Sequence, residues 1–300
     1  MKKVKLFTSV LVMALALVFA GCKHEMSEPD TPTEPGTTSE SEILHVPDDF
    51  VRINGGTFDE ADSTGTFHIV NTVTIKDFYI CSHEVTQKEY EMYCNYTGDN
   101  SPSDEYGRGE NYPAYYVSWY DAILYCNRRS LDEGLTPCYS IRGETNPDQW
   151  GEIPVLDPWA DNIWNRAKCN WNANGYRLPT REEWLYAARN ENLDDYMYSG
   201  SNAPGDIAWY EENSDLKFHE VKTKAPNGKG LYDMSGNVEE WTWTYDTQHH
   251  VIVGTIPCDR LLLGGEIYSD QERLKLEHRV LAHPAFRMST SGFRVVRSIL

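Results

Sequence analysis

The cysteines of this 300-residue chain have its most versatile chemistry, because a thiolate can attack a substrate, bind a soft metal ion or form a disulfide. Cys22 follows an apolar run near the N-terminus, and the others are Cys81, Cys94, Cys126, Cys138, Cys169 and Cys258. These six permit fifteen disulfide patterns, and the sequence does not choose among them. No CxxC or HxxxH pattern occurs, so we expect no zinc site. We expect surface positions for His249, His250, His278 and His283.

The segment that precedes Cys22 is typical of an export signal. Three lysines come before an apolar run over residues 6–20, and Gly21 follows it. This order predicts a secretory signal peptide over residues 1–21. The end of the run resembles the lipobox of bacterial lipoproteins, with Phe19 in place of the usual leucine. We therefore expect lipidation of Cys22 and an exported protein anchored at the outer membrane or cell surface, the alternative being a soluble secreted protein cleaved nearby.

Residues 22–45 predict a flexible tether. The stretch from Lys23 to Glu42 contains no aromatic residue and a single large apolar one among Pro, Ser, Thr and Glu. Such a stretch cannot bury enough surface to offset the entropy lost on ordering. The folded domain is therefore expected over residues 46–300, a size compatible with one large domain.

The composition is that of a globular protein with an acidic surface. Hydrophobic residues make up 40% and charged residues 24%, which excludes a disordered chain, a coiled coil and a polytopic membrane protein. Without residues 1–21, 24 basic and 46 acidic residues remain, a formal charge of −22. We expect no nucleic-acid partner, because that would need a basic face.

Local signals predict an α+β fold with few helices, short antiparallel strands and much loop. Three capping boxes, each a Ser or Thr followed three residues later by an acid, predict helices that begin after Thr86, Ser118 and Thr180. Alternating apolar runs predict strands over residues 51–53 and within 73–80.

A series of longer motifs extends over nearly the whole folded part. They include Glu84-Val85-Thr86, Val117-Ser118-Trp119-Tyr120-Asp121-Ala122, Gly175-Tyr176-Arg177-Leu178-Pro179-Thr180, the run from Gly230 to Trp241, Gly264-Gly265 and Gly292-Phe293-Arg294. In this order they resemble the formylglycine-generating-enzyme (sulfatase-modifying factor) family. The resemblance implies an elaborated C-type lectin fold.

Most of these motif residues are interpreted as scaffold, because glycines, tryptophans and helix caps build folds everywhere. Arg177 and Arg294 are candidates for buried pairs with carboxylates such as that of Glu183, since an arginine can make bidentate bonds. Trp241 and Trp243 are two residues apart and are expected on one face of a strand.

Oxidising members of the family use two cysteines shortly after the Gly-Gly turn to bind copper and convert a substrate cysteine to formylglycine. The resemblance places Ser269 and Leu274 at these positions. Neither side chain can replace a thiolate, the kind of ligand that Cu(I) needs. We therefore expect no catalytic residue and no required cofactor. The alternative is a formylglycine-generating or related oxidase.

The resemblance also implies a structural calcium site. Family members bind the ion around the Gly-Asn-Val-x-Glu-Trp stretch, through backbone carbonyls and an acid, which are ligands that suit Ca²⁺. The matching positions are Asp233, Gly236, Val238 and Glu240. The alternative is that Asp233 and Glu240 pair with nearby arginines.

The segment over residues 264–297 keeps the family's frame and fills it with residues of mixed chemistry. Frame positions include Leu274, Leu276, Arg279, Pro284, Arg287 and Gly292-Phe293-Arg294. The residues predicted to bind a ligand lie between them and are Ile267, Tyr268, Ser269, Asp270, Glu272, Arg273, Glu277, His278, Val280, Leu281, Ala282, His283, Ala285, Phe286, Met288, Ser289 and Thr290. These fillers show no hydrophobic period, and a fixed frame with arbitrary fillers is typical of a diversified binding face.

The order of signal, lipobox, tether and variable segment resembles the treponemal variable lipoproteins of this family, which retroelements diversify. We therefore expect a non-catalytic surface lipoprotein that binds a protein or glycan ligand on another cell. Tyr268, His278, His283 and Phe286 are the expected anchors, because aromatic groups bring a large contact area at low entropic cost. The alternative is a family member whose C-terminal part has drifted.

Replacing Cys22 tests the predicted anchor. Two or more acyl chains give stable membrane attachment, whereas a single chain gives only marginal binding. We expect Cys22→Ala to move the protein from the membrane pellet to the soluble fraction, measured by immunoblotting after cell fractionation. Retention of the variant in membranes after a high-salt wash would show that the protein is not anchored through this cysteine.

Overall fold

The computed structural model describes residues 46–61, 70–154, 162–245 and 259–300. The predicted signal peptide and tether, and with them Cys22, lie outside the described residues, as do His249, His250 and Cys258. Within the described ranges, no helix is long and apolar enough to cross a membrane.

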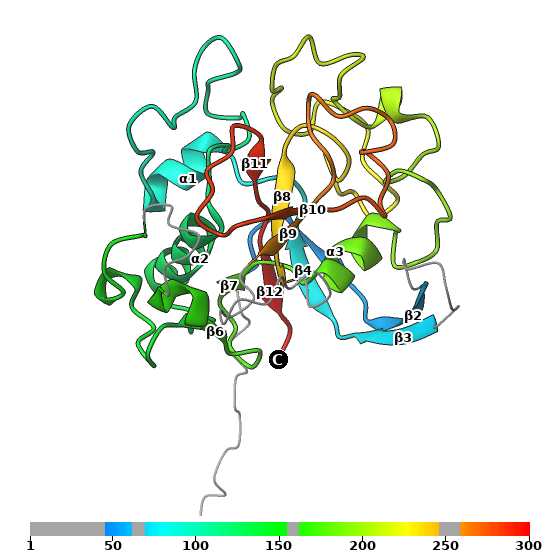
Figure 1. The fold of residues 1–300 in the computed structure, drawn as a ribbon. Coiled ribbons are helices and arrows are strands. Elements are labelled where there is room, and N and C mark those ends of the chain that lie inside the picture. The colour runs from blue at the N-terminus through cyan, green and yellow to red at the C-terminus, as the bar shows by residue number, and fades with distance from the viewer. Residues whose placement is uncertain (1–45, 62–69, 155–161, 246–258) are drawn as a thin grey trace, which may run out of the picture. The chain divides into compact units, whose positions relative to one another are not determined.

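Two four-stranded sheets organise the described residues (Figure 1). The first has the strand order β1–β4–β12–β7, and every neighbouring pair is antiparallel. Its strands are β1 (Phe50–Ile53), β4 (Phe78–Cys81), β12 (Val296–Ser298) and β7 (Tyr176–Arg177). The second has the order β10–β9–β8–β11, in which only β11 runs parallel to its neighbour. Its strands are β10 (Val280–Ala282), β9 (Arg260–Leu263), β8 (Glu239–Tyr245) and β11 (Ser291–Gly292).

Two smaller antiparallel pairs complete the described strands. They are β2 (Gly56–Ala61) with β3 (Val70–Ile75), and β5 (Tyr139–Ser140) with β6 (Lys168–Cys169). The strands predicted over residues 51–53 and 73–80 are confirmed as β1, β3 and β4. Short strands, few helices and long loops confirm the predicted α+β class.

The predicted helices begin at their capping boxes. They are α1 (Gln87–Tyr93), α2 (Trp119–Asp132) and α3 (Arg181–Ala188). In each helix the cap hydroxyl accepts a hydrogen bond from the third backbone N–H, and the acid at that position accepts one from the N–H of the cap. These reciprocal bonds satisfy two backbone donors that a helix start leaves free, so a local sequence signal is enough to place the start. Short 3-10 helices cover Pro147–Gln149, Ile163–Arg166 and Pro204–Asp206.

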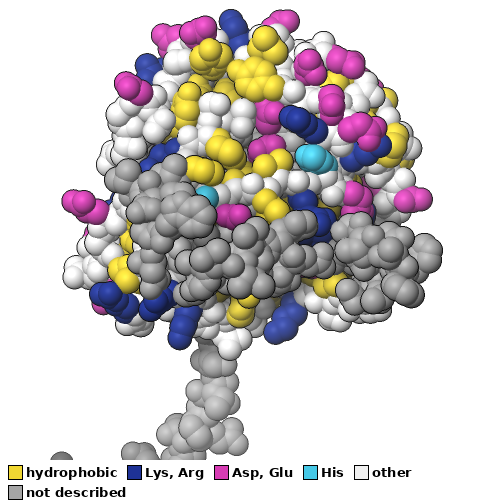
Figure 2. All heavy atoms as spheres, viewed as in Figure 1, with side chains coloured by type: hydrophobic (Ala, Val, Ile, Leu, Met, Phe, Trp, Pro, Cys, Tyr) yellow, Lys and Arg dark blue, Asp and Glu magenta, His cyan; other side chains and the backbone are white. Residues whose placement is uncertain are grey.

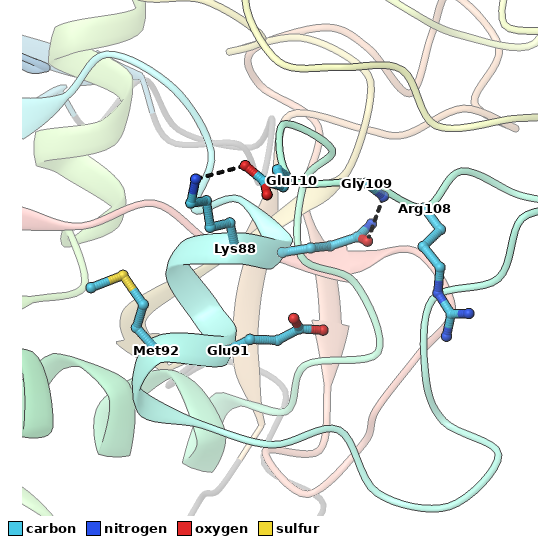
Figure 3. Close-up of a pocket in the computed structure, with 7 residues that line it drawn as sticks. Lys88, Glu91, Met92, Arg108, Gly109 and Glu110 are labelled. Atoms are coloured by element: carbon cyan, nitrogen blue, oxygen red, sulfur yellow. Dashed lines mark hydrogen bonds and ion pairs between the residues drawn. The ribbon is translucent and has the colours of Figure 1, made fainter.

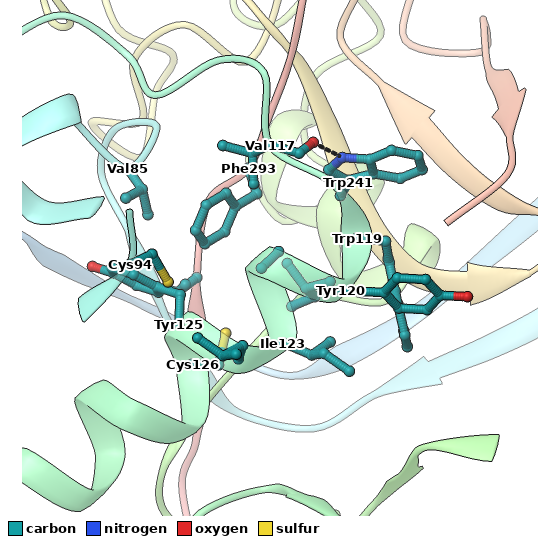
Figure 4. Close-up of a cluster of buried hydrophobic side chains, with 14 of the residues drawn as sticks. Val85, Cys94, Val117, Trp119, Tyr120, Ile123, Tyr125, Cys126, Trp241 and Phe293 are labelled. Atoms are coloured by element: carbon teal, nitrogen blue, oxygen red, sulfur yellow. Dashed lines mark hydrogen bonds between the residues drawn. The ribbon is translucent and has the colours of Figure 1, made fainter. Parts of the chain in front are cut away.

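The largest hydrophobic cluster is built around α2 (Figure 4). Tyr125 of this helix is fully buried, and its ring meets that of Phe293 edge-on, with centroids 5.2 Å apart. Trp241 of β8 packs in the same cluster and donates from its indole nitrogen to the Val117 carbonyl at 2.8 Å. Large aromatic side chains therefore join α2 to the second sheet, and the buried indole has the partner that it needs.

Residues 293–295 connect the two sheets. β11 ends at Gly292 in the second sheet, and β12 begins at Val296 in the first. A Cβ at position 292 would lie 2.5 Å from the Ala114 carbonyl oxygen, so only glycine fits at this crossing. The Gly-Phe-Arg motif is therefore a structural junction, with Phe293 in the core and Arg294 beside it.

Arg294 makes a buried ion pair with Glu240 of β8. Its Nε and Nη2 atoms lie 2.7 Å and 2.6 Å from the two carboxylate oxygens, and neither side chain is more than 1% exposed. Trp184 of α3 donates to the same carboxylate at 2.7 Å, and Arg294 Nη1 donates to the Cys81 carbonyl of β4. The pair thus bonds to both sheets and to a helix.

Arg177 and Arg294 both form the predicted pairs with carboxylates. Arg177 donates to the two oxygens of Glu183 at 2.6 Å and 2.7 Å, whereas Arg294 uses Glu240. Bidentate geometry of this kind suits the planar guanidinium group.

Removing the guanidinium group of Arg294 should destabilise the domain. Arg294→Ala leaves the Glu240 carboxylate buried without its cation, which costs about 3–5 kcal/mol in comparable pairs. We expect a loss of that order in the free energy of unfolding, measured by urea denaturation at pH 7. The matched control is Arg52→Ala, which removes an exposed ion pair with Asp77 and should leave the transition nearly unchanged. Equal effects of the two substitutions would contradict the structural role of the buried pair.

Candidate ligand-binding site

Residues 264–290 form the segment drawn from orange to red between β9 and β11 in Figure 1. It begins at Gly264 and Gly265, whose φ angles of +99° and +69° lie in the left-handed region. A Cβ on Gly265 would lie 2.9 Å from the Arg273 carbonyl oxygen, so the Gly-Gly turn lets the segment fold back on itself. On the face seen in Figure 2, hydrophobic, acidic and basic side chains are interspersed rather than gathered by type.

The structure exposes many of the predicted ligand-binding side chains. The exposed residues are Tyr268, Asp270, Glu272, Arg273, Glu277, Phe286 and Ser289. The half-buried residues are His278, Val280, Leu281, Met288 and Thr290. Two of the predicted anchors, Tyr268 and Phe286, are 38% and 36% exposed. Both rings are therefore accessible to a ligand.

The expected exposure is wrong for Ile267, Ser269, Ala282, His283 and Ala285, which are buried. Ile267 packs with Phe218 and Val238 in a small hydrophobic cluster. The Ser269 hydroxyl accepts from the backbone N–H of Glu266 at 3.0 Å and so closes the turn after the glycines. These buried side chains stabilise the conformation of the segment, because an irregular loop also needs buried contacts to hold one conformation.

His283, expected at the surface and as an anchor, lies beneath Phe286 instead. It is 6% exposed, and its Nδ1 accepts from the Ala285 backbone N–H at 3.3 Å. The His283 and Phe286 rings meet edge-on with centroids 5.9 Å apart. Burial lowers the pKa of His283, so the ring is neutral at pH 7. Ala282 and Ala285 are buried because they belong to the main core cluster.

The two positions that carry copper cysteines in oxidising family members are structural in this chain. Leu274 is fully buried and packs with Tyr198 and Tyr210. Ser269 closes the turn described above. Neither position supplies a thiolate, and both side chains already have a role in packing or hydrogen bonding.

The remaining described thiols are free. They are Cys81, Cys94, Cys126, Cys138 and Cys169. Burial raises the pKa of the Cys138 thiol to about 11, and it also raises the pKa of Cys94 and Cys126. These three thiols are therefore protonated at pH 7, whereas a nucleophile or metal ligand must be a thiolate.

Glu240 does not fit the implied calcium site. Arg294 and Trp184 donate to its carboxylate oxygens, so the predicted alternative of an arginine pair is confirmed for this residue. Asp233 Oδ2 accepts from the Lys222 backbone N–H at 2.8 Å. Its Oδ1 is buried without a hydrogen-bond partner among the described residues, and burial raises the pKa of Asp233 to about 6.

No group of three His, Cys, Asp or Glu side chains that could hold a metal ion occurs in the described part of the chain. A calcium ion bound through the backbone at Gly236 and Val238 would therefore have to do without the Glu240 carboxylate. Calcium binding through the backbone of Gly236 and Val238 stays a prediction.

Glu239 is a residue of the site that the sequence analysis missed. It is the first residue of β8, lies opposite Ser291 of β11 and is only 8% exposed. Its carboxylate has no hydrogen bond or ion pair with any described residue, and the carboxylate of Glu266, which is 6% exposed, lies nearby. Burial, followed by the charge of Glu266, raises the pKa of Glu239 to about 7. Its identity as the variable residue of Gly-Asn-Val-x-Glu-Trp is the only signal that could have drawn attention to it.

Tyr268 lies next to Glu266 and close to further tyrosine side chains. The Tyr268 backbone N–H donates to the Glu266 carboxylate at 2.7 Å. Burial raises the pKa of the Tyr268 hydroxyl, and Tyr106, Glu266, Tyr116 and Glu105 are the neighbours that raise it further. Tyr106 is 39% exposed. Accessible phenol rings and buried carboxylates therefore share this end of the second sheet.

Two hollows contain none of the predicted binding residues. A cavity of about 540 Å³ lies beside α1, where Lys88 and Glu110 form an exposed ion pair at 2.6 Å (Figure 3). A groove of about 740 Å³ lies along β3 and reaches Leu300. In the first cavity the charges of opposite sign compensate each other, so it does not select an ionic ligand.

Comparison with known proteins places this geometry in a family. The Sulfatase-modifying factor enzyme 1-like domain matches residues 36–299. Chaperone protein LppX of Paenibacillus barcinonensis is 41% identical over 272 residues, which cover 84% of this chain and 90% of that protein. Formylglycine-generating enzyme of Mus musculus is 28% identical over 260 residues, which cover 74% of this chain and 66% of that protein.

A solved structure, Treponema denticola variable protein 1, has the same fold. Its TM-score is 0.69 at 31% identity, and the match covers 83% of this chain and 94% of that one. The elaborated C-type lectin fold of the formylglycine-generating-enzyme type is therefore confirmed.

The raised pKa of Glu239 predicts that this residue destabilises the folded protein more at high pH than at low pH. The folded state keeps this proton up to about pH 7, whereas the unfolded chain releases it near pH 4.5, so the contribution of Glu239 to stability falls as pH rises through that window. Glu239→Gln removes the charge, and we expect it to stabilise the protein at pH 8 by up to about 3 kcal/mol and to have little effect at pH 5. Urea denaturation at both pH values measures the difference.

Glu152→Gln, at an exposed position outside the site, is the control and should have no such pH-dependent effect. A gain for Glu239→Gln that is equal at both pH values would contradict the assignment of the raised pKa to this residue.

Proposed function

We propose that this chain, which belongs to the Sulfatase-modifying factor enzyme 1-like domain family, is a non-catalytic cell-surface protein that binds a protein or glycan through residues 267–290. One observation carries the proposal. Side chains of mixed chemistry are exposed along this segment, while the frame residues between them are buried or paired.

The frame is independent of the exposed fillers. Leu274 and Leu276 are 0% and 3% exposed, and Arg287 forms a bidentate pair with Asp121 of α2 at 2.8 Å and 2.9 Å. Since these contacts point inward, exposed residues such as Tyr268 can change without loss of the fold. This separation supports a binding role on a rigid scaffold.

A non-catalytic role is supported by the residues at the two copper positions. Ser269 and Leu274 lack the sulfur that Cu(I) requires, and both are buried in structural contacts. The 28% identity to the mouse enzyme supports the shared fold without supplying these thiolates. Formation of formylglycine from a cysteine-containing sulfatase peptide in the presence of copper would favour the enzyme alternative.

Attachment to the outer membrane through lipidated Cys22 completes the proposal. It rests on the sequence pattern before that cysteine, which lies outside the described residues. The tether of residues 22–45 would hold the domain away from the membrane and make the binding face accessible to a ligand on another cell.

Diversification of the binding face by a retroelement is supported by the mixed chemistry of the fillers and by the similarity to Treponema denticola variable protein 1. Such diversification predicts that the neighbouring DNA contains a near-copy of the segment that encodes residues 266–297. This copy would differ only at adenines and would lie next to a reverse transcriptase gene. Only the exposed fillers can vary without loss of stability, because the buried fillers support the fold.

A chaperone role is a second candidate, and the 41% identity to Chaperone protein LppX favours it. In that role the same face would contact a partly folded protein. The interspersed charges in Figure 2 suit a specific ligand better than a broad apolar surface would. The test is whether the protein suppresses the aggregation of a partly folded protein. If it does, and if changes at Tyr268 and Phe286 have no effect on this activity, the chaperone surface lies elsewhere on the molecule.

Alanine substitutions at Tyr268 and Phe286 test the binding face. The wild-type chain is first applied to printed arrays of glycans and extracellular proteins to find a ligand. Each substitution should then lower affinity for that ligand at least about tenfold, because it removes an aromatic anchor. The melting temperature should stay close to that of the wild type, since both rings are exposed.

Tyr196→Ala is the control, because this ring is 44% exposed and lies outside the segment. It should change neither binding nor stability. Unfolding of the Tyr268 or Phe286 variant would identify these rings as core, and unchanged affinity would place the ligand elsewhere.

A further inference from the structure

The unpartnered carboxylate of Glu239 indicates the chemistry of the ligand. We propose that Glu239 and Glu266 together bind a basic side chain, in the first place an arginine, on a partner protein. This inference rests on the proposed ligand-binding function and narrows the ligand to a protein with an accessible cation.

The two acids are buried near each other, and neither forms an ion pair with a described residue. Glu239 is 8% exposed and Glu266 is 6% exposed. The Glu266 carboxylate accepts from the Tyr268 backbone N–H and the Ser269 hydroxyl, which fix its position at 2.7 Å and 3.2 Å. Glu239 is fixed through its backbone N–H, which donates to the Thr290 carbonyl at 3.0 Å, while its carboxylate has no partner among the described residues.

Two other buried acids of the domain pair with an arginine. Glu240 pairs with Arg294, and Asp121 pairs with Arg287. Glu239 and Glu266 have only the attraction of Arg273, which is exposed and forms no ion pair with either acid among the described contacts. Two like charges at low dielectric are costly unless a proton or a cation joins them. An arginine of a ligand would supply this missing charge.

The surroundings suit an organic cation. Tyr268, which lies next to Glu266, and its neighbour Tyr106 are partly exposed. A guanidinium group can lie on a phenol ring while it donates to carboxylates. A divalent metal would need more oxygen ligands, and the described residues contain no metal-binding group of three acids, histidines or cysteines. The acidic net charge of the chain would also attract basic partners.

Titration with a small probe tests the site. Nα-acetyl-arginine amide is added to the full exported chain, and binding is followed by isothermal calorimetry or NMR. We expect saturable binding that is at least about tenfold weaker for the neutral citrulline analogue. Nα-acetyl-lysine amide distinguishes a guanidinium from an ammonium ligand, and we expect the arginine probe to bind more tightly because its fork can bridge two carboxylates.

Glu239→Gln and Glu266→Gln should each weaken binding of the arginine probe at least about tenfold, whereas the control Glu152→Gln should not. In the wild type, affinity should rise about tenfold from pH 6 to pH 8 as Glu239 loses its proton. The charged groups that act on it are Glu266 and Arg273, and Tyr268 lies next to Glu266. The Glu239→Gln variant should lose this pH dependence.

Equal binding of the arginine and citrulline probes would overturn the inference, as would unchanged affinity in Glu239→Gln or selective binding of CaCl₂ at the same residues. Absence of probe binding, together with Tyr268-dependent binding of an array ligand, would also overturn it and would leave the proposed function standing.

Discussion

The domain depends on the buried pair of Arg294 and Glu240. Burying two charges is unfavourable unless their remaining hydrogen-bonding groups are satisfied. Here Trp184 serves the carboxylate, and the Cys81 and Tyr232 carbonyls accept from the guanidinium group. Since Glu240 belongs to the second sheet, Cys81 to the first, Trp184 to α3 and Tyr232 to a loop, this one interaction links both sheets, a helix and a loop. The pair lies outside residues 264–290, so changes at the exposed positions of that segment leave it intact.

Consecutive glutamates of β8 have contrasting environments. Glu240 points to the face where Arg294 neutralises it, whereas Glu239, on the opposite face of the strand, has no cation of its own. The first stabilises the scaffold, and the second is costly to the folded state. An uncompensated buried acid is the kind of local conflict that proteins retain at functional sites.

Local sequence signals predicted much of the fold, whereas features that depend on long-range contacts could not be predicted. The capping boxes placed all three described α-helices because the cap and its acid are three residues apart. The arginine pairs followed from side-chain chemistry, although the choice of Glu240 for Arg294 needed the structure. Burial of Ile267 and His283 was not predictable, because an irregular loop has no period to separate inward from outward positions. Glu239 was missed for a related reason, since it belongs to β8 and only the fold brings it near Glu266, which follows the Gly-Gly turn.

The position of β12 has a consequence for how the chain folds. This strand lies between β4 and β7, and its Val296 is opposite both Ile80 and Arg177. The first sheet therefore stays in two separate pieces until a ribosome has added residue 298. Contacts over such sequence separations form slowly, because loop closure costs entropy before any pairing is gained. A nascent chain that folds late would stay unfolded for longer, which would suit passage through a translocation channel.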